Sequence, residues 1–256
     1  MRRTERGGSV SGPNAEAVST LRRYLQQRLD TGEKMALRVR TQPGAVAKTE
    51  PAASVTTSPA AIPQQHLAES PQDDSLARVA AEVRACTACR LHATRTNAVP
   101  GVGPDGAALL FVGEGPGADE DAKGEPFVGR AGQLLTKIIE SVQMKREDVF
   151  ITNIVKCRPP GNRDPEPDEI AACRPFLERQ VRLLQPRVIC TLGRHAASTL
   201  LGKQESMARL RTERHTYAEI PVFPTYHPAA LLRNPQWKRP VWEDIQKVRR
   251  ACDGAD

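Results

Sequence analysis

This sequence of 256 residues lacks the features of a membrane-spanning or secreted chain. No stretch approaches the ~18 consecutive apolar residues that a membrane-spanning helix requires. The first residues, MRRTERGGSVSG, are basic but contain no apolar run of the kind that forms a secretory signal. Glu5 and Glu16 argue against a mitochondrial presequence as well. We therefore expect a protein without a membrane-bound part, located in the cytoplasm of a bacterium.

Aromatic residues are missing altogether from residues 41–75, a segment rich in Ala, Pro, Ser, Thr and Gln. A segment of this composition cannot bury enough apolar surface to offset the entropy that ordering would cost. We expect residues 1–75 to be a mostly disordered N-terminal extension, with a possible helix at 15–31 behind an N-cap at Asn14. Such a helix is either solvated or a docking site for a partner protein, and the sequence does not distinguish the two.

Acidic residues are in the minority, because 30 Asp and Glu stand against 37 Lys and Arg, which gives a net charge of +7. Most of this excess lies beyond residue 75 rather than in a basic tail. The balance suits a polyanionic partner such as a nucleic acid, but many basic proteins bind nothing acidic. Charge alone therefore favours a nucleic-acid partner only weakly.

Apolar runs and helical spacings alternate from about residue 76, and they predict one packed domain over residues 76–250, followed by a polar tail at 251–256. Strands that alternate with helices indicate a mainly parallel sheet covered on both faces. We expect an α/β fold, a three-layer α/β/α sandwich with a central, mainly parallel four-stranded sheet. In such sheets the loops after the carboxyl ends of the strands form the binding site. The predicted strands are 107–113, 149–156, 188–192 and 222–226, and the predicted helices are 132–142, 168–184 and 195–201.

Six cysteines occur in the chain, and four of them are spaced like metal ligands. Cys190 falls inside a buried strand pattern and is expected in the core, whereas Cys252 lies in the polar tail without an evident partner. In an intracellular protein of this size, disulfides are disfavoured and a metal site is favoured. Four thiolates hold either zinc or an iron–sulfur cluster, and ordinary structural cysteines remain a third interpretation. The four candidate ligands are Cys86, Cys89, Cys157 and Cys173.

The first predicted strand ends in a glycine-rich turn, GEGPG, at residues 113–117. The turn matches neither the P-loop pattern nor the dinucleotide-binding pattern G-x-G-x-x-G, so a nucleotide-binding hydrolase would rest on its glycines alone. It does allow close backbone approach to a ligand, as at Gly115, and it places one carboxylate, Glu114, at the tip of a strand.

Two further residues of unusual type lie near strand ends. Phe127, in the loop sequence PFVG, is either a lid on the core or a platform on which a flat base stacks. Asn153 lies inside the apolar strand sequence ITNIVK. Its amide either bonds neighbouring backbone or presents the donor and acceptor that fit the edge of a pyrimidine.

The sequence TYHPAALLRNP at residues 225–235 follows the last predicted strand. His227 is placed where a ligand would bind. The tip formed by Leu231, Leu232 and Arg233 either wedges into a DNA duplex or starts a helix that packs on the core.

Five motifs in consistent order resemble the family-four uracil-DNA glycosylases, members of the uracil-DNA glycosylase superfamily. They are CTAC at 86–89, VGEGPGADEDAKGEPFVGRAGQLL at 112–135, ITNIVKCRPPGNRDP at 151–165, the Cys at 173, and TYHPAALLR at 225–233. The resemblance covers about residues 80–250. It implies a DNA repair enzyme that flips uracil out of DNA and hydrolyses its N-glycosidic bond, leaving an abasic site. It also implies a [4Fe-4S] cluster on Cys86, Cys89, Cys157 and Cys173, and we expect a monomer.

The same resemblance implies a role for each residue around the base. Phe127 would stack on the flipped uracil, and Asn153 would read its O4 and N3 edge. Glu120 would fill the space near C5, where thymine carries a methyl group, and Gly115 would belong to the same binding pocket. His227 would hydrogen-bond O2, where negative charge grows as the base departs. The water that attacks the sugar would be positioned by Glu114 and Asn162.

Two other interpretations compete with this one. A non-cleaving iron–sulfur or zinc protein that binds nucleic acid explains the charge and the cysteines, but it leaves Glu114, Asn153 and His227 without a role. A phosphate-binding hydrolase would need a Lys or Ser/Thr that the GEGPG turn lacks. A relative that becomes covalently trapped on DNA carries a basic insertion with a nucleophilic His, whereas residues 154–172 contain neither.

Overall fold

The computed structural model describes residues 74–254. The extension expected at residues 1–75, with its helix at 15–31, therefore lies almost entirely outside the described residues. None of the helices within residues 74–254 combines the length and the hydrophobicity of a membrane span.

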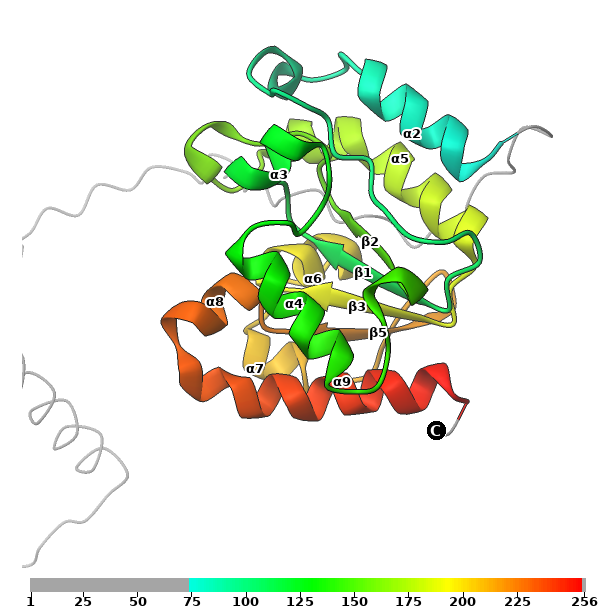
Figure 1. Ribbon diagram of the computed structural model, residues 1–256, viewed down its shortest axis with the longest axis vertical. Coiled ribbons are helices and arrows are strands. Elements are labelled where there is room, and N and C mark those ends of the chain that lie inside the picture. Colours follow the sequence, from blue (N-terminus) through cyan, green and yellow to red (C-terminus); the bar gives the residue numbers. More distant parts are fainter. Residues whose placement is uncertain (1–73, 255–256) are drawn as a thin grey trace, which may run out of the picture. The chain divides into compact units, whose positions relative to one another are not determined.

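The centre of the fold is a five-stranded sheet (Figure 1). Its strands are β1 (Leu109–Gly113), β2 (Phe150–Asn153), β3 (Val188–Leu192), β4 (His215–Tyr217) and β5 (Ile220–Thr225). They lie in the order β2-β1-β3-β5-β4, and every neighbouring pair is parallel except β5–β4. All residues of β1, β2 and β3 are buried, which is why continuous apolar runs mark these strands in the sequence.

The sheet contains one strand more than the four predicted. β4 is only three residues long, too short for an alternating pattern to stand out. It joins β5 through Ala218 and Glu219, whose φ angles of 49° and 65° lie in the left-handed region. A hairpin turn of that kind usually appears in a sequence as Asn-Gly or Asp-Gly, so the Ala-Glu pair gave no signal. The mainly parallel character of the sheet is as predicted, with β4 as an antiparallel edge.

Helices cover both faces of the sheet and confirm the three-layer sandwich (Figure 1). Leu110 and Val112 of β1 point to one face, while Leu109 and Phe111 point to the other. The first face carries α5 (Pro167–Leu184) and α6 (Arg194–Leu201), with α2 (Leu76–Ala85) packed on α5. The second face carries α4 (Arg130–Glu140) and α9 (Lys238–Cys252). The shorter elements are α3 (Ala118–Lys123), α7 (Met207–Leu210) and α8 (Pro228–Arg233), with 3₁₀ turns η1 (Arg90–Ala93), η2 (Arg146–Asp148), η3 (Pro160–Asn162) and η4 (Pro235–Trp237).

The C-terminal helix α9 was not predicted, and it corrects the assignment of Cys252. The helix is rich in charged residues, but Val241, Ile245 and Val248 recur at helical spacing and form a buried face. Cys252 continues that face and is only 7% exposed, so placing it in a polar tail without contacts was wrong. Cys190 is fully buried in the core, as predicted.

The parallel strands bring their carboxyl ends to one edge of the sheet. Gly113 at the end of β1 lies beside Asn153 at the end of β2, and Leu192 lies beside Thr225. The amide N–H of Gly193 then donates to the carbonyl oxygen of Thr225 at 2.8 Å. The loops that leave these four strands therefore converge, and they are the loops in which the sequence placed its chemistry-bearing residues.

Candidate active site

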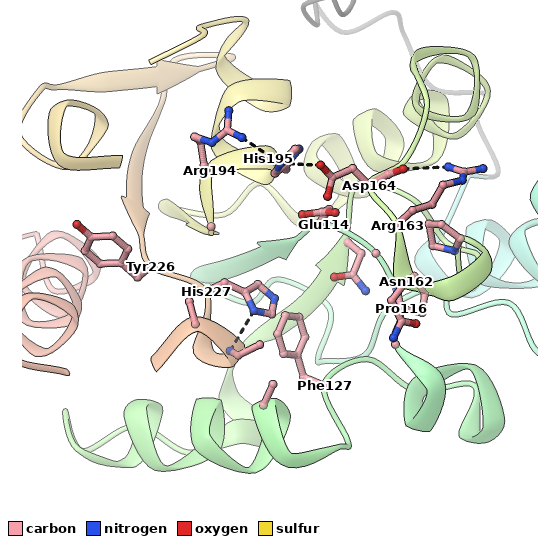
Figure 2. A pocket seen from close by; sticks show the side chains of 18 of the residues that line it. Glu114, Pro116, Phe127, Asn162, Arg163, Asp164, Arg194, His195, Tyr226 and His227 are labelled. Atoms are coloured by element: carbon pink, nitrogen blue, oxygen red, sulfur yellow. Dashed lines mark hydrogen bonds and ion pairs between the residues drawn. The ribbon is translucent and has the colours of Figure 1, made fainter. Parts of the chain in front are cut away.

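A cavity of about 720 Å³ opens at the carboxyl edge of the sheet. Loops after β1, β2, β3 and β5 contribute its wall, and Figure 2 shows it from close by. The cavity gathers all but two of the residues predicted to bind base, DNA or water. The residues gathered are Glu114, Gly115, Glu120, Phe127, Asn153, Asn162, His227 and Arg233.

The two predicted residues outside the cavity wall are Leu231 and Leu232 of α8. Leu231 is 1% exposed and packs in the core, so its predicted contact with DNA was wrong. Successive residues of a helix point about 100° apart, which leaves Leu232 44% exposed on the outside. The apolar part of the predicted DNA wedge is therefore reduced to Leu232.

Asn153 supplies a buried acceptor to the cavity. Its side chain is 1% exposed, and its Oδ1 finds no hydrogen-bond donor within residues 74–254. Gly113 lies beside it, where a Cβ would come within 2.3 Å of Oδ1 and 2.7 Å of the Phe127 ring. A glycine at the tip of β1 thus lets the amide and the aromatic ring meet in the cavity. A buried polar atom without a partner costs about 1–3 kcal/mol, which a ligand with a matching donor would relieve.

Phe127 is held in a backbone conformation that is rare for an aromatic residue. Its φ angle is 53°, in the left-handed region. Gly132 permits this, because a Cβ there would lie 1.8 Å from the carbonyl oxygen of Phe127. The Oε1 atom of Glu120 accepts hydrogen bonds from the amides of Val128 and Gly129, both at 2.9 Å. The loop is therefore fixed by Glu120 on one side and by close packing on the other.

His227 faces Phe127, with the two ring centroids 5.6 Å apart (Figure 2). It caps α8, and its Nδ1 accepts the amide N–H of Ala229 at 3.1 Å. Burial, followed by the positive charge of Arg233, lowers the pKa of His227 to about 4. The ring is therefore neutral at pH 7, and because Nδ1 accepts, the ring proton lies on Nε2. His227 thus presents a neutral N–H donor.

Glu114 lies across the cavity from Phe127, next to Asp164 and His195 (Figure 2). One ligand-type atom from each of the three side chains lies within 4.8 Å of the other two. Burial, then the charge of Asp164 and a hydrogen bond shared with it, raises the pKa of Glu114 to about 7, against the opposing effect of Arg194. Asp164 in turn contacts His195, with Oδ2 and Nε2 separated by 3.0 Å. Glu114 is therefore suited to exchanging a proton near neutral pH.

Asn162 enters the cavity from η3 in a left-handed backbone conformation, with a φ angle of 55°. Arg158 Nε donates to its Oδ1 at 2.7 Å. An arginine only donates, so the oxygen of the amide must face Arg158 and the NH₂ group remains for other partners. The side-chain orientation of Asn162 is thus set by Arg158.

The four cysteines proposed as metal ligands line a second, small cavity between α2, the segment after β2, and α5. All four are unpaired thiols. Backbone and side-chain donors point at their sulfur atoms: Arg95 Nη1 lies 3.0 Å from the Sγ of Cys157, and the amide of Lys156 lies 3.2 Å from the Sγ of Cys173. Convergent thiols with N–H donors around them fit both zinc and an iron–sulfur cluster. Cys86 and Cys89 complete the set of four and line the same small cavity.

Sequence reasoning missed Asp164, His195 and Arg194 as residues of the larger cavity. One signal for His195 and Arg194 was available, because both directly follow Gly193 after the third strand, where parallel sheets place their sites. Asp164 stood within the motif CRPPGNRDP without a distinguishing feature. Its importance arises only from the two side chains that it meets in space.

Comparison with known proteins identifies similar sequences over most of the described residues. A family model described as the uracil DNA glycosylase superfamily matches residues 100–246. A type-4 uracil-DNA glycosylase of Saccharolobus solfataricus is 51% identical over 187 residues, covering 70% of this chain and 87% of that protein. The type-4 uracil-DNA glycosylase of Sulfurisphaera tokodaii is 49% identical over 185 residues, 69% of this chain and 84% of its own length. That of Archaeoglobus fulgidus is 45% identical over 187 residues, 70% of this chain and 94% of its own length.

Proposed function

Because the chain belongs to the uracil DNA glycosylase superfamily, we propose that its large cavity receives a uracil flipped out of DNA and that the surrounding residues recognise and release it. The protein is a uracil-DNA glycosylase, a DNA repair enzyme that hydrolyses the N-glycosidic bond of uracil in DNA and leaves an abasic site. The base must leave the helical stack to reach such a cavity, at a cost of a few kcal/mol.

The unpartnered Oδ1 of Asn153 is the observation that carries the assignment of the base pocket. Uracil presents N3–H, a donor, beside O4, an acceptor. The amide of Asn153 offers the complementary pair, with Oδ1 accepting from N3–H and Nδ2 donating to O4. Cytosine presents an acceptor at N3 and a donor at N4, so both contacts would be mismatched. The orphan acceptor therefore favours uracil over cytosine.

Phe127 supports this pocket as the face on which uracil stacks. Its constrained backbone, with a φ angle of 53°, is the kind of local strain that surrounding structure must hold in place. The two amide hydrogen bonds to Glu120 provide that hold. In this role Glu120 fixes the stacking platform, while its carboxylate occupies the side of the pocket where the C5 methyl group of thymine would lie.

His227 stabilises the departing base. As the C1′–N1 bond breaks, negative charge develops on uracil and is shared by O2. The N–H on Nε2 of the neutral imidazole donates to O2, and this interaction strengthens as the charge grows. A neutral donor does not need to be protonated first, so His227 works throughout the range above its pKa of about 4.

Glu114 and Asn162 position the water that attacks C1′. Glu114 accepts a proton from the water, a task for which a carboxylate with a pKa of about 7 is suited. Asn162 contributes its NH₂ group, since Arg158 occupies the amide oxygen. Arg233 and the exposed Leu232 lie next to the cavity on α8, where they contact the DNA strand.

The decisive experiment uses an oligonucleotide with one deoxyuridine, followed by alkali and a sizing gel. We expect His227→Ala to lower the excision rate by ~10²–10³-fold, and Asn153→Asp to lose the preference for uracil. His215→Ala serves as the control, because it also removes a buried imidazole but lies outside this cavity. Normal excision by His227→Ala would reject its role, and normal uracil kinetics of Asn153→Asp would reject the base-reading contact.

Four cysteine thiolates around one small cavity would hold a [4Fe-4S] cluster. When bound, the cluster would link three chain segments that are distant in the sequence, and so contribute to folding. We expect the purified protein to contain iron and acid-labile sulfide in equal amounts. Cys173→Ser should lose both, whereas Cys252→Ser, outside the small cavity, should keep both. Zinc without sulfide in the purified protein would reject the cluster.

The catalytic unit is proposed to be residues 76–250, acting as a monomer in the bacterial cytoplasm, with residues 1–75 free to bind a partner protein. The three relatives align with 69–70% of this chain while 84–94% of their own lengths is covered, which supports an extension outside the shared unit. A protein lacking residues 1–75 should retain uracil excision and should elute as a monomer in size-exclusion chromatography. Loss of soluble protein on this deletion would make the extension part of the fold.

A further inference from the structure

Asp164 and His195 meet on the side of the cavity that holds Glu114, opposite Phe127 (Figure 2). The Oδ2 atom of Asp164 lies 3.0 Å from Nε2 of His195. Arg194 Nη2 approaches the same ring nitrogen at 3.3 Å. Nε2 cannot donate to a carboxylate and accept from a guanidinium at once. The contact with Asp164 is the shorter of the two, so we assign the proton to Nε2, which donates it to Asp164. His195 thereby fixes the carboxyl group of Asp164.

Both members of this pair are held in place by neighbouring parts of the fold. Arg163 Nη1 donates to the backbone oxygen of Asp164 at 2.9 Å, and Arg163 is itself bound to the fully buried Glu169. His195 is the second residue of α6 and lies two positions after Gly193, whose amide N–H donates to the end of β5. The position of Asp164 relative to Glu114 is therefore determined from two directions.

We propose that Asp164 is a positioning residue for the glycosylase reaction: anchored by His195, its carboxyl group is held within 4.8 Å of that of Glu114 and controls the transfer of a proton from the attacking water to Glu114. This inference rests on the function proposed above. In the step concerned, the water oxygen bonds to C1′ and the C1′–N1 bond breaks. The electron pair of that bond leaves with uracil, and the proton of the water goes to Glu114.

The charged and titratable groups around Glu114 come from two segments, one with Arg163 and Asp164 and the other with Arg194 and His195. Asp164, between η3 and α5, raises the pKa of Glu114 through its negative charge and the shared hydrogen bond, while Arg194 at the start of α6 lowers it. Across the cavity, Glu120 is engaged by two backbone amides, and His227 is neutral. Asp164 is thus the one charged neighbour in the described part of the cavity that delays ionisation of Glu114.

The test is the pH profile of single-turnover uracil excision by the full-length holoenzyme. We expect the wild-type rate to rise with pH through an acid limb near pH 7, because Glu114 must ionise. Asp164→Asn keeps the shape and removes the charge, so the limb should move to lower pH by about one unit. Asp105→Asn is the matched control and should leave the limb in place, because Asp105 is exposed in the loop before β1, at the opposite end of the sheet.

An acid limb that stays in place in Asp164→Asn overturns the proposal. If Asp164→Asn fails to fold, His195→Ala replaces it in the test. Loss of this anchor should move the acid limb in the same direction. His195→Gln restores a hydrogen-bond donor and should reverse the shift. An unmoved limb in His195→Ala is equally contrary to the proposal. Glu114→Gln distinguishes the role of Glu114 from that of Asp164. An acid limb that persists in this variant rejects Glu114 as the proton acceptor, whatever the result for Asp164.

Discussion

Glu114 follows strand β1 and Glu169 lies in the first turn of α5, and their surroundings shift the pKa of the carboxyl group in opposite directions. Glu169, near the start of α5, has a side chain that is 0% exposed and receives Arg163 at 2.6 Å and Arg90 at 2.9 Å. The amide of Glu166 adds a hydrogen bond at 2.8 Å. These donors, Arg163 foremost, lower the pKa of Glu169 to about 2.

Glu114 has the reverse environment. Burial and the neighbouring Asp164 raise the pKa of Glu114 to about 7, so its charge is only weakly compensated. The same cavity holds the unpartnered Oδ1 of Asn153 and the left-handed backbone of Phe127. The cavity thus contains several unfavourable local features, while the carboxylate of Glu169 near the start of α5 is paired with two arginines and a backbone amide. In this fold the fully paired carboxylate of Glu169 serves stability, whereas the weakly compensated carboxylate of Glu114 lies in the candidate active site.

The largest effect should come from breaking the paired region with Glu169→Gln. The pKa of Glu169 falls from its ordinary 4.5 to about 2, so the charged form stabilises the fold above pH 4.5 and loses that contribution as the pH falls toward 2. Because water screens the contact with Arg90, which is 60% exposed, we expect the free energy of unfolding to fall by about 2–3 kcal/mol at pH 7. Urea unfolding of the wild type and the variant at pH 7 and pH 3 measures this loss. A difference in unfolding free energy that is as large at pH 3 as at pH 7 contradicts this account.

Glu114→Gln should act in the opposite direction on stability. The pKa of Glu114 is raised from 4.5 to about 7, so the folded state binds more protons than the unfolded state between these values. Stability is therefore lost as the pH rises through that window, and the cost is complete above about pH 7. The variant should gain about 1–2 kcal/mol at pH 8 and almost nothing at pH 4.5. Thermal unfolding at both pH values tests this, and equal gains would refute it.

The sequence predicted the residues at the strand ends better than it predicted the elements β4 and α9. The residues at strand ends, such as Glu114 and His227, were found because parallel sheets place their sites there. The strand at 188–192 was predicted with its observed bounds because all its residues are apolar or small and buried. β4 and α9 escaped, the first through an atypical turn and the second through its many charged residues.

The charge states of the site could not be predicted from sequence. The spacing of Asp164 and His195 along the chain says nothing of their 3.0 Å contact, which depends on how the loops before α5 and α6 pack. The proton on Nε2 of His227 follows from one backbone hydrogen bond to Nδ1. Such properties belong to the three-dimensional arrangement, so motifs identify the residues while geometry assigns what each one does.

The smallest effect should come from Asp168→Asn, at the outer edge of the paired region. Asp168 contacts Arg90 at 3.2 Å, but the two side chains are 69% and 60% exposed. Water competes with such a pair, so we expect a change within about 0.5 kcal/mol in urea unfolding. Asp168 and Glu169 are adjacent and share Arg90, so the contrast with Glu169→Gln isolates burial from net charge. A loss as large as that of Glu169→Gln would show that the number of acidic groups near Arg90, rather than their burial, stabilises this end of α5.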